Sequence, residues 1–348
     1  MRVLVIGPEW FYPITEFVHQ AFLFNKHDAK FIYYQYASNE KQAYYVRKLK
    51  QIHLYNSFQN VIDGKIEKNI FENNNNEILK ECKENIYDLI FIIKGNFIHS
   101  ETIREIKQHN SKIKIYVWYM DDPFILWGDN NKYIFQRESI KSIKYFDKVF
   151  VFDDYFVDGI KYRLNKEIHY LPLAFDDHTY KKINLQKKYN IAFIGCQTEE
   201  RYRYLKNIEE YGLTLFGGDW QDLNKYKMGD VIPVEKSNQI YNESLINFNF
   251  HINQTVYGAN TRTFEVPGSG NFLLTDFRNA IAKHFEIGKE IDCYTSKDEL
   301  KEKVKYYLEN KDKAEEIANA GYKRAASEHT YKHRIKYVLE LFNKTTRS

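Results

Sequence analysis

The best candidates for binding an anion lie in residues 257–270, where an asparagine, an arginine and a glutamate are closely spaced. Asn260 is suited to cap a helix, because its side-chain oxygen can accept a hydrogen bond from a free backbone N–H. Arg262 and Glu265 are three residues apart and so share one face of that helix. Free N–H groups beside an arginine favour a diphosphate, and a carboxylate one turn later can accept hydrogen bonds from two ribose hydroxyls. The alternative is a capped helix whose arginine and glutamate pair only with each other.

Two glycine turns are further candidates for a ligand site. Gly195 follows an apolar run at 190–194, and Gly217 follows another at 213–216. A glycine at the carboxyl end of a parallel strand lets a ligand approach the backbone. Arg201 follows Gly195 closely enough to reach a phosphate, although a plain glycine turn with a solvated arginine is the alternative. The segment lacks the G-x-G-x-x-G pattern of dinucleotide-binding proteins.

Two adjacent carboxylates, Asp121 and Asp122, follow an apolar run at 114–119. Either is a candidate general base for an acceptor hydroxyl, or a group that stabilises an oxocarbenium-like transition state. The alternative is that Asp122 caps a helix beginning at Pro123. Adjacent aspartates do not form the spaced Asp-x-Asp arrangement of metal sites, so we expect no metal. Glu9 and the turn Lys94-Gly95-Asn96 are additional candidates at predicted strand ends.

Alternating strands and helices must position these residues. Short, nearly continuous apolar runs predict strands buried on both faces, and the stretches between them are mostly helical. In the first half we expect strands at 3–6, 30–34, 88–93, 114–119 and 148–152. In the second half we expect them at 190–194, 213–216, 247–251, 271–274 and 290–294. This alternation predicts an α/β protein with two Rossmann-like, doubly wound domains.

The predicted domains are residues 1–175 and 190–330, joined by a lysine-rich linker at 176–189. Residues 331–348 are expected to form a C-terminal helix that crosses back to the N-terminal domain. Ser296 and Glu299 have the spacing of a capping box, which predicts a helix start there. The asparagine run at 73–76 predicts a loop.

Composition excludes several classes of protein. The 51 basic and 47 acidic residues are interspersed and leave a net charge of only +4, which argues against nucleic-acid binding but not against an anionic ligand or peripheral contact with a membrane. The three cysteines form no C-x-x-C pair, so neither a zinc site nor a disulfide framework is expected. No apolar run reaches the roughly 18 residues that span a bilayer, and the first run is too short for a signal peptide. We therefore expect a cytoplasmic protein.

The pattern Asn260-x-Arg262-x-Phe264-Glu265 resembles the core of the CgeB-like (spore maturation protein) glycosyltransferases, where a glycine turn and an apolar strand follow it. The likeness continues in order and spacing through 121–123, 171–174, 193–195, 285–290, 298–300, 306–308, 317–321, 329–331 and Arg334. It implies the GT-B fold, in which two Rossmann-like domains face each other across a cleft. It also implies transfer of a sugar from a nucleotide-linked donor.

In such a protein, residues 190–330 would bind the donor, with Glu265 on the ribose and Arg262 and Arg201 on the diphosphate. The resemblance implies a UDP- or GDP-linked donor, no cofactor and no metal. Residues 1–175 would bind a glycan, lipid-linked or protein acceptor, in cell-surface glycan or protein glycosylation. One departure is Tyr257, which replaces the first glutamate of the Glu-x7-Glu motif of many retaining enzymes, so the anomeric outcome is not carried over. The alternatives are a nucleotide-sugar epimerase on the same fold and a non-catalytic nucleotide-sugar-binding subunit.

Overall fold

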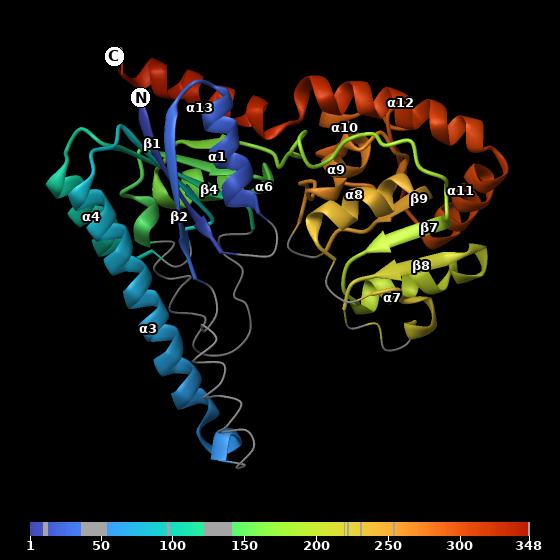
Figure 1. Cartoon of the computed structure of the whole chain (residues 1–348), viewed down its shortest axis with the longest axis horizontal. Coiled ribbons are helices and arrows are strands. Elements are labelled where there is room, and N and C mark those ends of the chain that lie inside the picture. Colours follow the sequence, from blue (N-terminus) through green and yellow to red (C-terminus); the bar gives the residue numbers. More distant parts are fainter. Residues whose placement is uncertain are drawn as a thin grey trace. The chain divides into compact units, whose positions relative to one another are not determined.

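The structure is a computed structural model in which residues 1–9, 13–35, 54–95, 98–121, 141–218, 220, 223–229, 232–252 and 255–346 are described. The chain divides into two compact units. The first comprises Met1–Phe152 and Phe156–Leu171, and the second comprises Asp153–Tyr155 and Pro172–Ser348. Each unit is built around its own parallel sheet with helices on its faces (Figure 1).

The first unit contains a six-stranded sheet with the order β2-β1-β3-β4-β5-β6, and all neighbouring strands are parallel. Its strands are β1 (Arg2–Pro8), β2 (Asp28–Tyr34), β3 (Leu89–Ile93), β4 (Lys114–Tyr119), β5 (Lys148–Val151) and β6 (Ile168–Tyr170). Its helices are α1 (Ile14–Phe24), α3 (Leu54–Glu84), α4 (Ser100–His109) and α6 (Tyr155–Leu164). The five predicted strands are present within two residues of the expected ends, whereas the short strand β6 was not expected.

Aromatic side chains fill the core of this sheet. Phe91, on the fully buried strand β3, packs against Phe22, Trp118 and Phe150. The indole N–H of Trp118 donates to the carbonyl of Leu171 at 2.9 Å, so this buried polar group is satisfied. The continuous apolar composition of β3 and β4 is explained by burial on both faces.

The predicted loop at 73–76 is wrong, because these asparagines lie inside α3. Asn74 exchanges hydrogen bonds of 3.0 Å with the backbone N–H and carbonyl of Gln35. Asn75 accepts from the N–H of His99 at 2.7 Å and from the hydroxyl of Thr102 at 2.6 Å. These tertiary hydrogen bonds outweigh the weak intrinsic helix propensity of asparagine.

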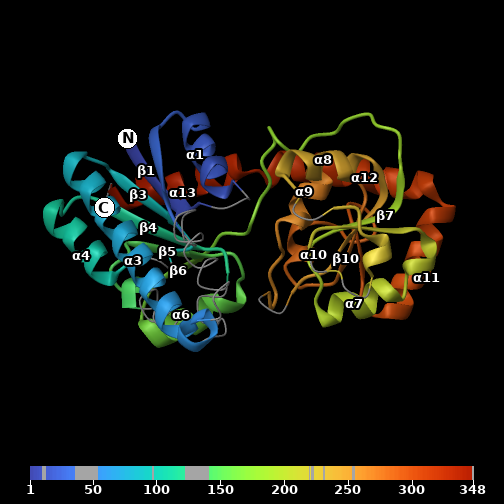
Figure 2. The ribbon, with the colours of Figure 1, turned by 60° about the horizontal axis from the view of Figure 1, so that its bottom comes forward.

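The second unit contains a five-stranded parallel sheet with the order β11-β10-β9-β7-β8. Its strands are β7 (Tyr189–Ile194), β8 (Leu213–Phe216), β9 (Ser244–Asn249), β10 (Leu273–Asp276) and β11 (Asp292–Tyr294). Its helices are α7 (Glu199–Lys206), α8 (Val234–Asn242), α9 (Arg262–Gly268), α10 (Ile281–His284), α11 (Lys297–Glu309), α12 (Lys311–Glu328) and α13 (Tyr331–Thr346), with 3-10 turns η1 (Glu209–Tyr211) and η2 (Asn224–Tyr226). Figure 2 shows α8 and α9 on one side of its strands and α7 and α11 on the other.

All five strands predicted for the second half are present, displaced by at most three residues. In both sheets the order of strand addition reverses once, between β1 and β3 in the first unit and between β7 and β9 in the second. Open α/β sheets bind ligands at the carboxyl ends of the strands beside such a reversal. The second reversal lies next to Gly195 and Arg201.

The start of α11 is explained by a local sequence signal, and the lysine-rich stretch before β7 is held by a tertiary contact. The Ser296 hydroxyl accepts from the N–H of Glu299 at 3.1 Å, as the predicted capping box requires. The Glu299 carboxylate accepts at 2.7 Å from the N–H of Thr295, one residue before the cap, instead of from that of Ser296. The lysine-rich stretch before β7 belongs to the second unit. It is held to α8 by Asn242, whose side chain accepts from the N–H of Ile183 at 2.8 Å.

Candidate functional site

The start of α9 is held in place by Asn260. Its side-chain oxygen accepts from the N–H of Thr263 at 3.3 Å, so it satisfies a free N–H at the helix start. Its amide also exchanges hydrogen bonds of 3.0 and 3.1 Å with the amide of Asn249, the last residue of β9. Asn260 therefore joins the helix start to the carboxyl end of the neighbouring strand.

Glu265 lies one turn into α9 and is only 3% exposed. The Tyr241 hydroxyl donates to its Oε2 at 3.1 Å, and Tyr180 stacks on Tyr241 with ring centroids 6.1 Å apart. Burial, followed by the negative charge of Glu265, raises the pKa of Tyr241, while the nearby Arg262 opposes the rise. Glu265 thus lies in a buried, tyrosine-lined position, and Arg262 beside it is half-buried.

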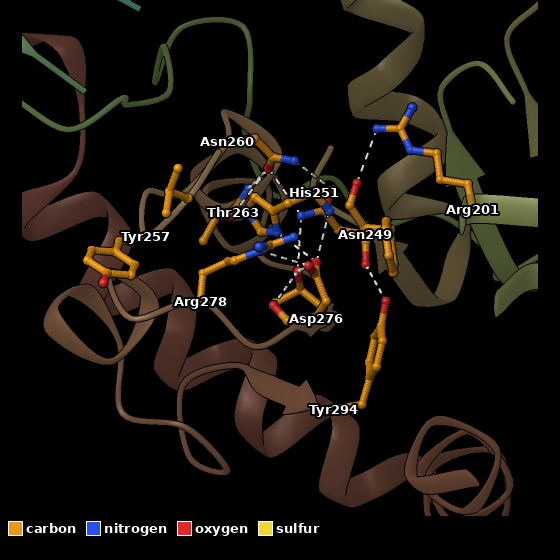
Figure 3. A network of polar contacts seen from close by, with 12 residues as sticks. Arg201, Asn249, His251, Tyr257, Asn260, Thr263, Asp276, Arg278 and Tyr294 are labelled. Carbon is orange, nitrogen blue, oxygen red and sulfur yellow. Dashed lines mark hydrogen bonds and ion pairs between the residues drawn. The ribbon is translucent and has the colours of Figure 1, made fainter. Parts of the chain in front are cut away.

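A network of polar side chains lies where β9 and β10 end (Figure 3). His251, which is fully buried, has its Nδ1 2.7 Å from Oδ1 of Asp276, and Arg278 donates from Nε to Oδ2 of Asp276 at 3.0 Å. Nε2 of His251 lies 3.4 Å from the Thr263 hydroxyl in α9. Because the carboxylate can only accept, Nδ1 of His251 donates to it, and Nε2 faces Thr263.

Burial by itself would raise the pKa of Asp276, but His251 and Arg278 outweigh burial, and the pKa is lowered. Sequence reasoning missed this network. The available signal was the position of two polar residues, His251 and Asp276, at the carboxyl ends of neighbouring strands, where side chains converge in a parallel sheet. The sequence predicts a strand at 247–251 that includes His251, whereas β9 ends two residues before it.

Arg201 lies on α7 and is buried, with 5% exposure. Its terminal nitrogens donate to the carbonyl of Cys196 at 3.0 Å and to that of Phe250 at 3.1 Å. These carbonyls follow β7 and β9, so the guanidinium joins the two strand ends at the reversal of strand order. Burial first, and then the positive charge of Arg262, lowers the pKa of Arg201 to about 10. Two guanidinium groups therefore repel each other here, and a bound anion would relieve that repulsion.

The two candidate glycines allow close approach of β7 and β8. Gly217 has φ of +117°, and a Cβ built on it would lie 2.5 Å from the carbonyl oxygen of Gly195. The same carbonyl accepts from the indole N–H of Trp220 at 2.9 Å. These contacts explain Gly217 by backbone packing, and ligand approach at Gly195 and Gly217 stays a prediction.

Comparison with known proteins finds similarity to glycosyltransferases. Residues 199–340 match the family described as glycosyl transferase-like. The spore protein CgeB of Bacillus subtilis is 23% identical over 243 residues, which are 63% of this chain and 72% of CgeB. The chain is therefore similar to CgeB and, over residues 199–340, to glycosyl transferase-like proteins.

Solved structures show the fold of this CgeB-like chain. Sucrose-phosphate synthase from Thermosynechococcus elongatus aligns with a TM-score of 0.64 at 9% identity, covering 100% of this chain and 99% of that one. HepE from Anabaena, solved in complex with UDP, aligns with a TM-score of 0.62 at 10% identity, covering 99% of this chain and all of HepE. The fold is GT-B. Among the helices that the structure describes, none combines the length and apolar composition needed to cross a lipid bilayer.

In this CgeB-like chain, Tyr257 stands where many retaining enzymes have a glutamate, and it is 41% exposed. The loop around it is held by Asp153, whose carboxylate accepts from the N–H of Val256 at 2.8 Å and from that of Tyr257 at 3.1 Å. Asp153 is fully buried, and a Cβ on Gly258 would lie 3.0 Å from it. The loop that leads to Asn260 is therefore fixed by one buried carboxylate, which sequence reasoning also missed.

The candidate base Asp121 lies in the first unit and forms an ion pair. Its Oδ2 is 2.6 Å from the ammonium group of Lys94, which follows β3. The carboxylate follows β4, so the pair joins the ends of two neighbouring strands. Asp122, Pro123 and Asn96 lie outside the described residues.

Proposed function

We propose that this CgeB-like chain transfers a sugar from a UDP- or GDP-linked donor to an acceptor hydroxyl. The observation that carries the proposal is the positive charge of Arg201 and Arg262 at the carboxyl ends of β7 and β9, beside the start of α9. Further support comes from HepE, which has been solved with UDP and with UDP-glucose.

The donor diphosphate would lie at the start of α9, with Arg262 as its principal contact. Positive charge at that place stabilises the nucleotide as it leaves with the bonding electrons, which is the main electrostatic demand of the reaction. Arg201 already donates to two carbonyls, so we assign it the role of a fixed positive charge beside the diphosphate. Glu265 is assigned to the ribose hydroxyls, with Tyr241 orienting its carboxylate through the 3.1 Å hydrogen bond.

The acceptor is assigned to the first unit, with Asp121 or Asp122 as the group that takes the proton from the attacking hydroxyl. The ammonium group of Lys94, 2.6 Å from Oδ2 of Asp121, holds this carboxylate at the end of β4. A glycan, a lipid-linked sugar or a protein would each supply such a hydroxyl. Cell-surface glycan synthesis or protein glycosylation at the cytoplasmic side, with peripheral membrane contact, is the setting that we propose.

Catalysis without a metal is part of the same proposal. Within the described ranges, no group of at least three His, Cys, Asp or Glu side chains is placed to hold a metal ion. In the assigned site the charge of the leaving diphosphate is balanced by guanidinium groups instead.

The experiment that tests the proposal is a turnover assay with a panel of UDP- and GDP-sugars, each with and without a mixed glycan acceptor pool. Transfer predicts release of the nucleoside diphosphate that depends on acceptor. Conversion of the donor to an isomeric nucleotide sugar without acceptor would identify an epimerase instead. Binding without any turnover across the panel would identify a non-catalytic subunit.

A further inference from the structure

A hollow of about 780 Å³ lies in the second unit at the amino ends of β9 and β10. Leu245, near the start of β9, and Phe272, just before β10, contribute to its wall. The donor site lies at the carboxyl ends of the same strands. A strand of six residues such as β9 spans about 17 Å, so the two places are separated by the height of the sheet.

Three lysines line this hollow: Lys182, Lys187 and Lys311. In the part of the chain that the structure describes, none of them forms an ion pair with a carboxylate. Lys182 donates instead to the amide oxygen of Asn319 at 2.7 Å, and Lys187 donates to that of Asn271 at 2.9 Å. Glu315 is the acidic residue among the lining side chains. The hollow therefore carries an excess of positive charge.

Lysines just outside the hollow do have carboxylate partners. Lys303 on α11 is 3.0 Å from Asp292, and Lys313 on α12 is 2.7 Å from Glu316. The lack of carboxylate partners is thus a property of the lysines that line the hollow and not of this region in general.

Lys187 has an exposed side chain, and its ammonium group is bound to the buried side chain of Asn271. Burial lowers the pKa of Lys187 to about 8, Glu315 raises it and the nearby Lys182 lowers it further. The two ammonium groups are therefore close enough to repel each other. A bound anion would remove this repulsion.

We propose that this hollow binds a small phosphate-bearing molecule, at a second site distinct from the nucleotide-sugar site. Ammonium groups bind phosphate oxygens as point charges, and three of them line this hollow. The wall contributed by Phe272 and Tyr307, whose ring centroids are 4.4 Å apart, accommodates an apolar portion of the ligand. Binding would place the negative charge of the phosphate at the amino ends of β9 and β10, whose carboxyl ends form the donor site.

The test uses the full chain with its donor site disabled by Arg262→Ala/Glu265→Ala as the parent protein, and inorganic pyrophosphate as the probe, measured by calorimetry at pH 7. The parent, with its lysines intact, should bind, and adding Lys187→Gln/Lys311→Gln should make it bind at least about tenfold more weakly, since two charge-assisted contacts are lost. Lys313→Gln in the same parent, on the same helix as Lys311 but outside the hollow, is the matched control and should bind as the parent does. Affinity should fall as the pH rises through about 8, where Lys187 loses its proton.

A second measurement does not depend on variants that fold. Pyrophosphate should protect Lys187 and Lys311, but not Lys313, from acetylation by acetic anhydride, as read by mass spectrometry of the wild type. No binding of pyrophosphate with the donor site disabled, or binding and protection that treat all three lysines alike, would overturn the second site. Neither result bears on sugar transfer, because the turnover assay addresses only the donor site.

Discussion

His251 and Asp276 are joined by a contact of 2.7 Å between Nδ1 and Oδ1, which connects the segment after β9 to the last residue of β10. The contact is completed by Thr263, which lies 3.4 Å from the other ring nitrogen of His251 and belongs to the first turn of α9. The start of α9 thus has a defined position relative to the ends of two strands. A diphosphate site at that helix start requires such a defined position.

Replacing His251 by alanine should weaken binding of a nucleoside diphosphate by about tenfold, although the side chain is fully buried and is not assigned to the ligand. The loss follows from a less well-placed α9, and the melting temperature should fall as well because Asp276 loses a partner. Calorimetry and thermal melting measure the two effects. His178→Ala, at an exposed position, is the control. Unchanged nucleotide affinity in His251→Ala would contradict the positioning role.

Direct contacts are tested by Arg262→Ala and Glu265→Ala. Each should cost about 1–3 kcal/mol of nucleoside diphosphate affinity, the range for loss of a charge-assisted partner. Arg203→Ala is the matched control, because Arg203 is exposed and pairs with Glu199 on the surface of α7. Calorimetry with UDP and GDP gives the values, and wild-type affinity in both variants would remove these residues from the site.

The two aspartates are separated by Asp121→Asn and Asp122→Asn. The variant that removes the base should keep its nucleotide affinity and melting temperature but lose turnover by about 10²–10⁴. The other variant should be nearly silent if its residue caps a helix, because asparagine caps about as well as aspartate. Asp121→Asn also removes the charge that pairs with Lys94, so Lys94→Met controls for loss of that ion pair alone. Normal turnover in both aspartate variants would exclude both as the base and direct attention to Glu9.

Metal independence is tested by comparing initial rates of transfer in EDTA, in Mg²⁺ and in Mn²⁺. Equal rates are expected, because the assigned partners of the diphosphate are guanidinium groups. An absolute requirement for a divalent ion would show that the aspartate pair after β4 has a role other than the one assigned here.

Buried histidines should make the stability of the second unit depend on pH. Burial first, and then the positive charge of Arg334, lowers the pKa of His284 and of His329 to about 3. The unfolded chain has histidine pKa values of about 6.5, so between about pH 6.5 and 3 it binds protons that the folded chain does not. The free energy of unfolding should therefore fall as the pH drops below about 6.5.

Each of these histidines contributes about 1.4 kcal/mol per pH unit to that slope between pH 4 and 6. His329→Gln should reduce the slope of the unfolding free energy against pH by the contribution of one histidine, about 1.4 kcal/mol per pH unit. Urea unfolding at several pH values measures this slope. The exposed His178→Gln should leave the slope unchanged, and an equal slope in wild type and His329→Gln would contradict this explanation.

The strands could be predicted from sequence because burial on both faces leaves a nearly unbroken apolar run, as in β3 and β4. Asn260 could also be identified, since its capping role depends only on residues three positions away. The roles of His251 and Asp153 could not be identified in this way. Their partners are 25 and 103 residues away in sequence, and only the folded sheet and loop bring them together. The asparagines of α3 show the reverse case, in which tertiary partners overrule a local preference.

Asp153 has a consequence for any attempt to study the second unit in isolation. This unit is not one continuous stretch of chain, because Asp153–Tyr155 belong to it although Phe156–Leu171 belong to the first unit. A fragment that begins at Pro172 would lack the carboxylate that binds the N–H groups of Val256 and Tyr257. Its loop before Asn260 would lose its anchor, so weak nucleotide binding by such a fragment would report a truncation artefact. Fragment design and domain exchange between relatives should therefore carry residues 153–155 together with the second unit.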